Sequence, residues 1–247
     1  MIRHFLFLTL GFCLFGAPDA RALDCETVTF EGTAYDTCSV DLRDDDLRLW
    51  WAGPDGQPLL AFGEIARQAA QDGLDLAFAM NAGMYHEDRG PVGHLIIDGQ
   101  EHMRVVTSAG PGNFGMVPNG IFCWGKDKAR VVESRAYAKA QPKCRYATQS
   151  GPMLVLDGKL HPRFLADSPS LRLRNGVGVR KDGHTVIFAI TRSPVNFHSF
   201  ARFFRDRMDT PDALYLDGSI SRIYAPSLGR RGLGGRFGPM LGVVVPQ

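Results

Sequence analysis

The segment M-N-A-G-M-Y, residues 80 to 85, places an amide and small residues directly after an apolar run. The run from Leu76 to Met80 has the length of a buried strand, and Asn81 and Gly83 follow it. Asn81 has two donors and an acceptor that can orient a sugar hydroxyl or a phosphate oxygen, and Gly83 permits close approach of the backbone. The alternative is a strand that leaves its sheet through a glycine turn, with Asn81 bonded to its own backbone.

Three further segments are also strand ends with polar, small or charged residues. They are A-T-Q-S-G-P-M-L (147 to 154), R-L-R-N-G-V-G-V (172 to 179) and A-L-Y-L-D-G-S-I-S (213 to 221). In the last segment Asp217 follows the fully apolar run A-L-Y-L, so a carboxylate emerges at the end of a buried strand. The four strand ends together indicate a shared site built from distant parts of the chain.

The elements that position these residues are mostly hairpins. Asp-Gly pairs at 98–99, 157–158 and 182–183 lie between runs of β-type residues, a pattern typical of two-residue hairpin turns. Antiparallel pairing should therefore dominate the fold.

Two segments have the apolar spacing of helices, residues 58–71 and 197–208. A loop rich in Gly and Arg, residues 227–238, precedes an expected last strand from Met240 to Val245. The sequence predicts an α+β fold, a largely antiparallel or mixed β-sheet built from hairpins with a few packed helices, in a single domain of residues 23–247.

Residues 1–22 have the pattern of a signal peptide. Arg3 and His4 precede the apolar block 5–17, and Ala20-Arg21-Ala22 has the small-x-small form of a cleavage site. No later apolar run approaches the roughly 18 residues that a membrane helix needs, so we expect no membrane span. The expected location is periplasmic or secreted.

The cysteines that follow the predicted signal peptide support export. Cys25, Cys38, Cys123 and Cys144 form an even set that allows three pairings. We favour Cys25 with Cys38 and Cys123 with Cys144, because each pair brackets a short segment. Free buried thiols are the alternative, and disulfides are favoured in an oxidising compartment.

Charge excludes a nucleic-acid partner. Without residues 1–22 the formal charge falls from +2 to 26 − 25 = +1, which leaves no basic footprint. We expect no cofactor, while the metal requirement and the oligomeric state stay open. His86, Glu87 and Asp88 are consecutive and share no face of a regular element, so a solvated loop explains them better than a metal site.

In their order along the chain, the four strand-end segments resemble the phosphodiester glycosidase family. The resemblance runs from about Asp75 to the end and includes F-G-P-M-L-G-V-V, residues 237 to 244. It implies an exported α+β hydrolase that cleaves the bond between a sugar's anomeric carbon and a phosphodiester oxygen, with a phosphate monoester as leaving group. The implied partner is a sugar-phosphate or glycan substrate of the cell envelope.

The resemblance also implies site residues. Asp217 would act as nucleophile or general base at the anomeric carbon, and Arg174 would hold the phosphoryl oxygens in a bidentate fork. One carboxylate suffices, because a phosphate monoester with a second pKa of about 6 can leave largely unprotonated, whereas an alkoxide must be protonated as it departs. The implied substrate-binding residues are Asn81, Gly83, Gln149, Ser150, Asn175, Gly218 and Ser219. The family often has a hydroxyl residue where this chain has Asn175, which bears on the identity of the substrate.

Structural alternatives remain for these residues. Asp217-Gly218 fits a hairpin turn and Arg174 fits a solvated strand edge. Two other functions are also open: a conventional exported glycoside hydrolase that pairs Asp217 with Glu87, and a non-catalytic carbohydrate-binding protein of the cell envelope. A binding protein needs stacking aromatics on an open face, and the adjacent Trp50 and Trp51 point to opposite sides of a strand.

Overall fold

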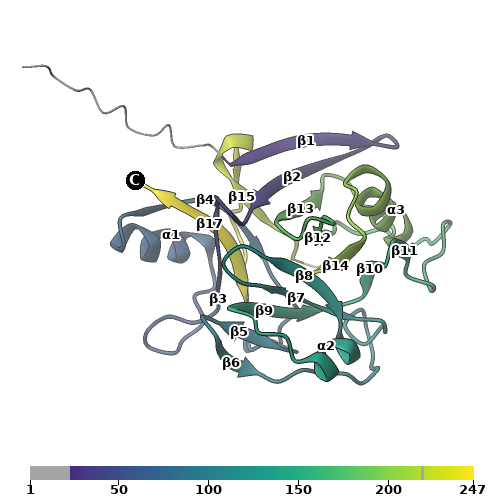
Figure 1. Cartoon of the computed structure of the whole chain (residues 1–247). Coiled ribbons are helices and arrows are strands. Elements are labelled where there is room, and N and C mark those ends of the chain that lie inside the picture. The colour runs from purple at the N-terminus through teal and green to yellow at the C-terminus, as the bar shows by residue number, and fades with distance from the viewer. Residues whose placement is uncertain (1–22, 218–219) are drawn as a thin grey trace, which may run out of the picture.

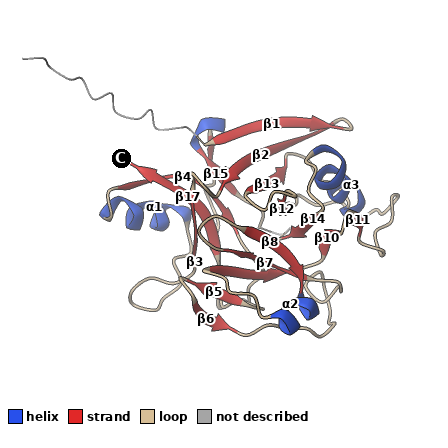
Figure 2. Ribbon diagram, viewed as in Figure 1, coloured by secondary structure: helices blue, strands red, loops and turns tan. Residues whose placement is uncertain are grey.

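The computed structural model describes residues 23–217 and 220–247, and the predicted signal peptide, Gly218 and Ser219 lie outside them. In the described residues the strands form three sheets, and neighbouring strands pair antiparallel throughout (Figure 1; Figure 2). The expected α+β fold with largely antiparallel sheet is confirmed.

The first sheet has seven strands in the described part of the chain. In spatial order these are β1 (Asp24–Phe30), β2 (Thr33–Asp41), β13 (Thr185–Thr191), β12 (Asn175–Val179), β14 (Asp212–Tyr215), β10 (Met153–Leu156) and β11 (Lys159–Leu160). The second sheet contains β16 (Arg230–Arg231), β15 (Ile223–Ala225), β4 (Leu74–Asn81), β17 (Met240–Pro246) and β3 (Asp46–Trp50). The third contains β6 (Gln100–Met103), β5 (Leu95–Ile97), β9 (Tyr146–Ser150), β7 (Gly120–Trp124) and β8 (Ala129–Glu133).

One central core lies between the three sheets, and each sheet contributes large apolar side chains to it. Phe188, Phe78 and Phe122 represent the first, second and third sheet in that cluster. The opposite face of each sheet is covered by one helix: α3 (Phe197–Arg202) on the first, α1 (Phe62–Gln71) on the second and α2 (Ser134–Ala140) on the third (Figure 2). This arrangement brings strand ends of all three sheets close together.

Helix α1 is shorter than the predicted segment 58–71. Pro58 pairs with Ala52 in an isolated β-bridge, and Leu60 has a left-handed φ of 68°, so regular helix begins only at Phe62. From there Phe62, Ile65 and Ala69 point to the second sheet with the expected helical spacing.

The second predicted helix, residues 197–208, is confirmed in extent. It comprises α3 and a π-helical turn, η1 (Phe203–Arg207), that continues it without a break. The side chain of Asn196 caps its start by accepting a hydrogen bond from the Ser199 backbone N–H at 2.9 Å. Helix α2 is absent from the sequence-based prediction.

The predicted local links are confirmed. The Asp-Gly pairs at 98–99, 157–158 and 182–183 join β5 to β6, β10 to β11 and β12 to β13. Disulfides join Cys25 to Cys38 and Cys123 to Cys144, the favoured pairing. The Gly- and Arg-rich segment contains a 3₁₀ turn, η2 (Pro226–Leu228), and β16 before β17 begins. No helix among the described residues is long and apolar enough to cross a membrane.

Candidate functional site

Strand ends from the three sheets meet at one junction. Asn81 is the last residue of β4, Asn175 is the first residue of β12, and Asp217 follows β14 by two residues. From the third sheet Gln149 and Ser150 end β9. Segments far apart in the sequence, and predicted to share a site, therefore lie side by side.

Asn175 is the hub of this junction. Its Nδ2 donates to the backbone O and to Oδ1 of Asn81, each at 3.1 Å. Its Oδ1 accepts the backbone N–H of Asp217 at 2.9 Å and the hydroxyl of Ser221 at 3.4 Å. Asn175 and Asn81 are both fully buried. The two asparagines thus hold the backbone that carries the Asp217 carboxylate.

Asn81 and Ser221 complete this network. Asn81 Oδ1 also accepts the backbone N–H of Arg222 at 3.0 Å, and the Ser221 hydroxyl donates to the Asp217 carbonyl at 2.6 Å. The Nδ2 of Asn81 has no hydrogen-bond partner among the described residues, although it is buried. An orphaned buried donor is costly, so this atom is a candidate for bonding a substrate oxygen.

Two contacts attach the third sheet to the junction. The Ser150 hydroxyl donates to the Leu216 carbonyl at 2.6 Å, directly before Asp217. The backbone N–H of Gly83 donates to Thr148 Oγ1 at 3.1 Å, and a Cβ at Gly83 would overlap the carbonyl oxygen of Gln149. Glycine is required at position 83 because two backbones approach each other closely there.

The Gln149 amide is fully occupied within the protein. Its Oε1 accepts the backbone N–H groups of His94 and Val106, each at 3.0 Å. Its Nε2 donates to the Val106 carbonyl at 2.5 Å and to the Ser134 hydroxyl at 2.8 Å. These four bonds use both donors of the amide nitrogen and two acceptor positions of the amide oxygen, and they tie β9 to the segments that surround it.

Arg174 is buried rather than solvated, with 1% of its surface exposed. Its guanidinium lies 3.6 Å from the ring centre of Phe197, Nε donates to the Val195 carbonyl at 2.8 Å, and Nη2 donates to the Ser170 carbonyl at 2.9 Å. No carboxylate within the described ranges lies at ion-pair distance from it. Burial lowers the pKa of Arg174, opposed by the hydrogen bond and charge of Tyr215.

Tyr215 connects Arg174 with Asp217. The Arg174 guanidinium carbon lies 5.6 Å from the centre of the Tyr215 ring. Burial raises the pKa of Tyr215, and the negative charge of Asp217 raises it further. Asp217 has the same effect on Tyr85. Burial and the negative charge of Asp217 together raise the pKa of Tyr85 to about 12. The Asp217 carboxylate is therefore near two tyrosines, one of which contacts Arg174.

Both tyrosines were missed as site residues by the sequence analysis. Each lies inside one of the four strand-end segments, Tyr85 in M-N-A-G-M-Y and Tyr215 in A-L-Y-L-D. Tyr215 is two residues before Asp217, so the period of a strand places both side chains on one face, which is the signal that identifies it.

The turn that contains His86, Glu87 and Asp88 is exposed, as expected for a solvated loop. Asp88 Oδ1 accepts the backbone N–H of Gly90 at 2.9 Å, and His86 N–H donates to the Gly90 carbonyl at 2.8 Å. Within residues 23–217 and 220–247, no group of three or more His, Cys, Asp or Glu side chains is arranged to hold a metal ion.

Comparison with known proteins agrees with this architecture. A family model described as phosphodiester glycosidase matches residues 75–229. The uncharacterized protein YigE of Escherichia coli (strain K12) is 33% identical over 222 residues, which cover 90% of this chain and 84% of YigE.

Two solved structures share the fold. The first is the catalytic domain of zebrafish N-acetylglucosamine-1-phosphodiester alpha-N-acetylglucosaminidase, auto-inhibited by its pro-peptide; it has a TM-score of 0.63 at 15% identity and covers 92% of this chain and 85% of that chain. The second is a protein of Burkholderia pseudomallei K96243, with a TM-score of 0.54 at 11% identity over 85% of this chain and 74% of that chain. At these identities the likeness concerns the fold alone.

Proposed function

Because this chain belongs to the phosphodiester glycosidase family, we propose that it is an exported hydrolase that cleaves the bond between a sugar's anomeric carbon and a phosphodiester oxygen. The products are a free sugar and a phosphate monoester. The two disulfides support export, because such bonds persist in oxidising compartments. In this proposal residues 1–22 direct export and residues 23–247 form one catalytic domain.

Asp217 is the proposed catalytic carboxylate. Its backbone is held by Asn175 and Ser221, and its charge acts on the hydroxyl groups of Tyr85 and Tyr215. A carboxylate fixed in this way attacks the anomeric carbon or deprotonates the attacking water. The two roles lead to the same prediction for its replacement.

Arg174 supplies the positive charge for the leaving phosphate. Two of its donors are taken by carbonyl groups, and its stacking on Phe197 fixes the plane of the guanidinium. Its charge has no carboxylate partner in the described part of the chain, and burial strengthens its interaction with a nearby anion. The side facing Tyr215 is the side from which it acts on the phosphoryl oxygens.

The remaining predicted residues divide into two groups in this proposal. Asn175, Gln149, Ser150 and Gly83 position the strand ends, because their polar groups are bonded within the protein. Asn81 also contacts substrate through its unpartnered Nδ2. Gly218 and Ser219, which lie outside the described residues, remain proposed substrate-binding residues.

The observation that supports this function best is that Tyr215, whose pKa is raised by the charge of Asp217, also contacts the buried Arg174 guanidinium, which has no carboxylate partner among the described residues. A leaving group that carries its own negative charge needs such a cation and needs no second carboxylic acid. An alkoxide leaving group would need that acid, and Glu87 is exposed in a turn. The arrangement therefore favours a phosphodiester over an ordinary glycoside.

The direct test is a substrate comparison. The protein without residues 1–22 is incubated with methyl phosphodiesters of glucose and N-acetylglucosamine in both anomers, and with the matching methyl glycosides. We expect release of free sugar and methyl phosphate from one or more phosphodiesters, abolished by Asp217→Asn, and no cleavage of the methyl glycosides. Cleavage of the methyl glycosides alone would identify a conventional glycoside hydrolase, and binding without cleavage would identify a carbohydrate-binding protein.

A further inference from the structure

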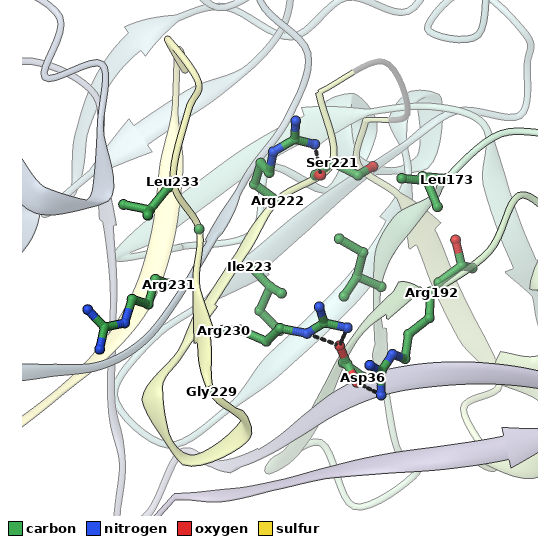
Figure 3. Close-up of a pocket in the computed structure, with 13 residues that line it drawn as sticks. Asp36, Leu173, Arg192, Ser221, Arg222, Ile223, Gly229, Arg230, Arg231 and Leu233 are labelled. Atoms are coloured by element: carbon green, nitrogen blue, oxygen red, sulfur yellow. Dashed lines mark hydrogen bonds and ion pairs between the residues drawn. The ribbon is translucent and has the colours of Figure 1, made fainter.

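A pocket with a volume of about 360 Å³ lies beside the strand-end junction and includes Ser221 and Arg222 in its lining. Its wall runs from Leu173 through Thr191 and Arg192 to Ser221, and a loop around Arg230 closes it (Figure 3). A pocket of this size accommodates a small organic ligand. We refer to it as the arginine pocket.

The charge of the arginine pocket is strongly positive. Four arginines line it, Arg192, Arg222, Arg230 and Arg231, against the single carboxylate of Asp36. Figure 3 shows the guanidinium groups of Arg192 and Arg230 around Asp36, while those of Arg222 and Arg231 point away from it. An anion entering this pocket is attracted by the whole set.

Asp36 carries one negative charge and forms ion pairs with two of these arginines, a close one with Arg230 and a longer one with Arg192. Its Oδ2 accepts bonds from Nε and Nη2 of Arg230, both at 2.6 Å, and its Oδ1 accepts the Thr27 hydroxyl at 2.8 Å. Arg192 stands 3.9 Å from Oδ1, too far for a hydrogen bond, and its side chain is 48% exposed. Its guanidinium donors make no hydrogen bond to any described residue, so they are available to a ligand.

The pocket also has an apolar surface. Ile190 and Ile223 form buried parts of its wall, and Leu173 and Leu233 are exposed by 36% and 78% at its edge. A free inorganic ion makes no use of such a surface, whereas a ligand with an aliphatic part removes it from water. Charge and apolar surface together indicate an amphiphilic anion.

We propose that the arginine pocket binds a phosphate monoester carried on an aliphatic chain. Arg192 grips the phosphate with its planar fork, and the aliphatic chain packs on Leu173 and Leu233. A phosphate monoester carries close to two negative charges at neutral pH, which matches a pocket with more than one unneutralised arginine. The ligand does not have to be a substrate.

Calorimetric titration with hexyl phosphate and with inorganic phosphate tests the pocket. Hexyl phosphate binds more tightly than inorganic phosphate, and Arg192→Ala weakens both by about tenfold, the scale of one lost charge-assisted hydrogen bond. Leu173→Ala weakens hexyl phosphate only. Arg130→Ala and Leu165→Ala replace an exposed arginine and an exposed leucine outside the pocket and leave both affinities unchanged. Arg230 is a poor choice for this test. Its loss removes the hydrogen-bonded partner of the buried Asp36 carboxylate, which should lower the stability of the fold.

Three results would overturn the proposal: no binding of hexyl phosphate, binding that Arg192→Ala does not weaken, or binding lost in Arg174→Lys and retained in Arg192→Ala. Equal affinity for inorganic and hexyl phosphate would overturn the claim that the pocket binds the aliphatic chain of the ligand. The titration needs no catalysis, since hexyl phosphate has no glycosidic bond. A protein that binds it and cleaves no sugar phosphodiester would refute the function proposed above and leave the arginine pocket intact.

Discussion

Replacing Asn175 by Ala tests whether this residue positions Asp217 for catalysis in addition to stabilising the fold. The substitution removes the bonds to Asn81 and the acceptor for the Asp217 backbone N–H, all within a fully buried cluster. One N–H that loses its buried partner costs about 1–3 kcal/mol, and the lost bond to Asn81 adds about 1 kcal/mol. We expect the free energy of unfolding to fall by about 2–4 kcal/mol.

Activity should fall beyond what this loss of stability explains. The carboxylate loses the bond that fixes its backbone, and a displacement of about 1 Å in a catalytic group costs on the order of 100-fold in rate. The assay is urea unfolding followed by fluorescence, with kcat/KM on a sugar phosphodiester measured where the variant is fully folded.

Thr210→Ala is the matched control for this experiment. Thr210 is also buried, and its hydroxyl donates to the Phe204 carbonyl at 3.0 Å behind the first sheet. Its loss should lower stability by about 1 kcal/mol and leave kcat/KM unchanged. If Asn175→Ala were destabilised and yet as active as Thr210→Ala, the placement of Asp217 would not depend on Asn175 and our reasoning would be wrong.

Further predictions concern the reaction, the disulfides and pH. Asp217→Asn should lower turnover by about 100-fold or more on sugar phosphodiesters and on aryl glycosides alike, and unchanged phosphodiester turnover would remove Asp217 from its role. Arg174→Lys should lower turnover on phosphodiesters more than on a synthetic substrate with an uncharged good leaving group; this ratio is independent of the amount of folded enzyme, and an equal loss on both would contradict the phosphate contact. Replacing Cys123 and Cys144 by Ser should cost roughly 2–5 kcal/mol of stability in urea titrations, and a smaller loss would show that packing alone holds this segment. Burial lowers the pKa of His94 below its ordinary 6.5, so the unfolded chain binds more protons and stability falls as pH drops through 6.5; His94→Gln should flatten that part of a plot of Tm against pH, and an unflattened plot would assign the loss to other groups.

Local features of this fold could be predicted because their causes are local. An Asp-Gly pair adopts the positive φ angles of a tight turn, as Asp98 and Gly99 do at 48° and 82°. Cys25 and Cys38 face each other because the hairpin between them sets their register. Strand pairing across long separations has no such signal. Nothing in the segment of β2 indicates that it pairs with β13, which lies about 150 residues away.

The candidate site could be predicted as a set of residues and not as a set of roles. Apolar runs that end in Asn81, Asn175 and Asp217 identify strand ends, and the structure brings these three together. Whether an amide faces substrate or its own protein depends on neighbours from other elements. Gln149 is occupied by His94, Val106 and Ser134, contacts that the segment A-T-Q-S does not reveal. The burial of Arg174 against Phe197 is equally a property of the assembled fold.

The position of β17 determines when this protein can complete its folding. Residues 240–246 form a strand that pairs with β4 on one side and β3 on the other. A nascent chain that lacks this strand leaves both neighbours with unpaired edges, and β4, which ends at Asn81, is then paired only with β15. The second sheet can therefore close only after residue 246 has been synthesised, because the contacts that close it join residues 46–81 to residues 240–246.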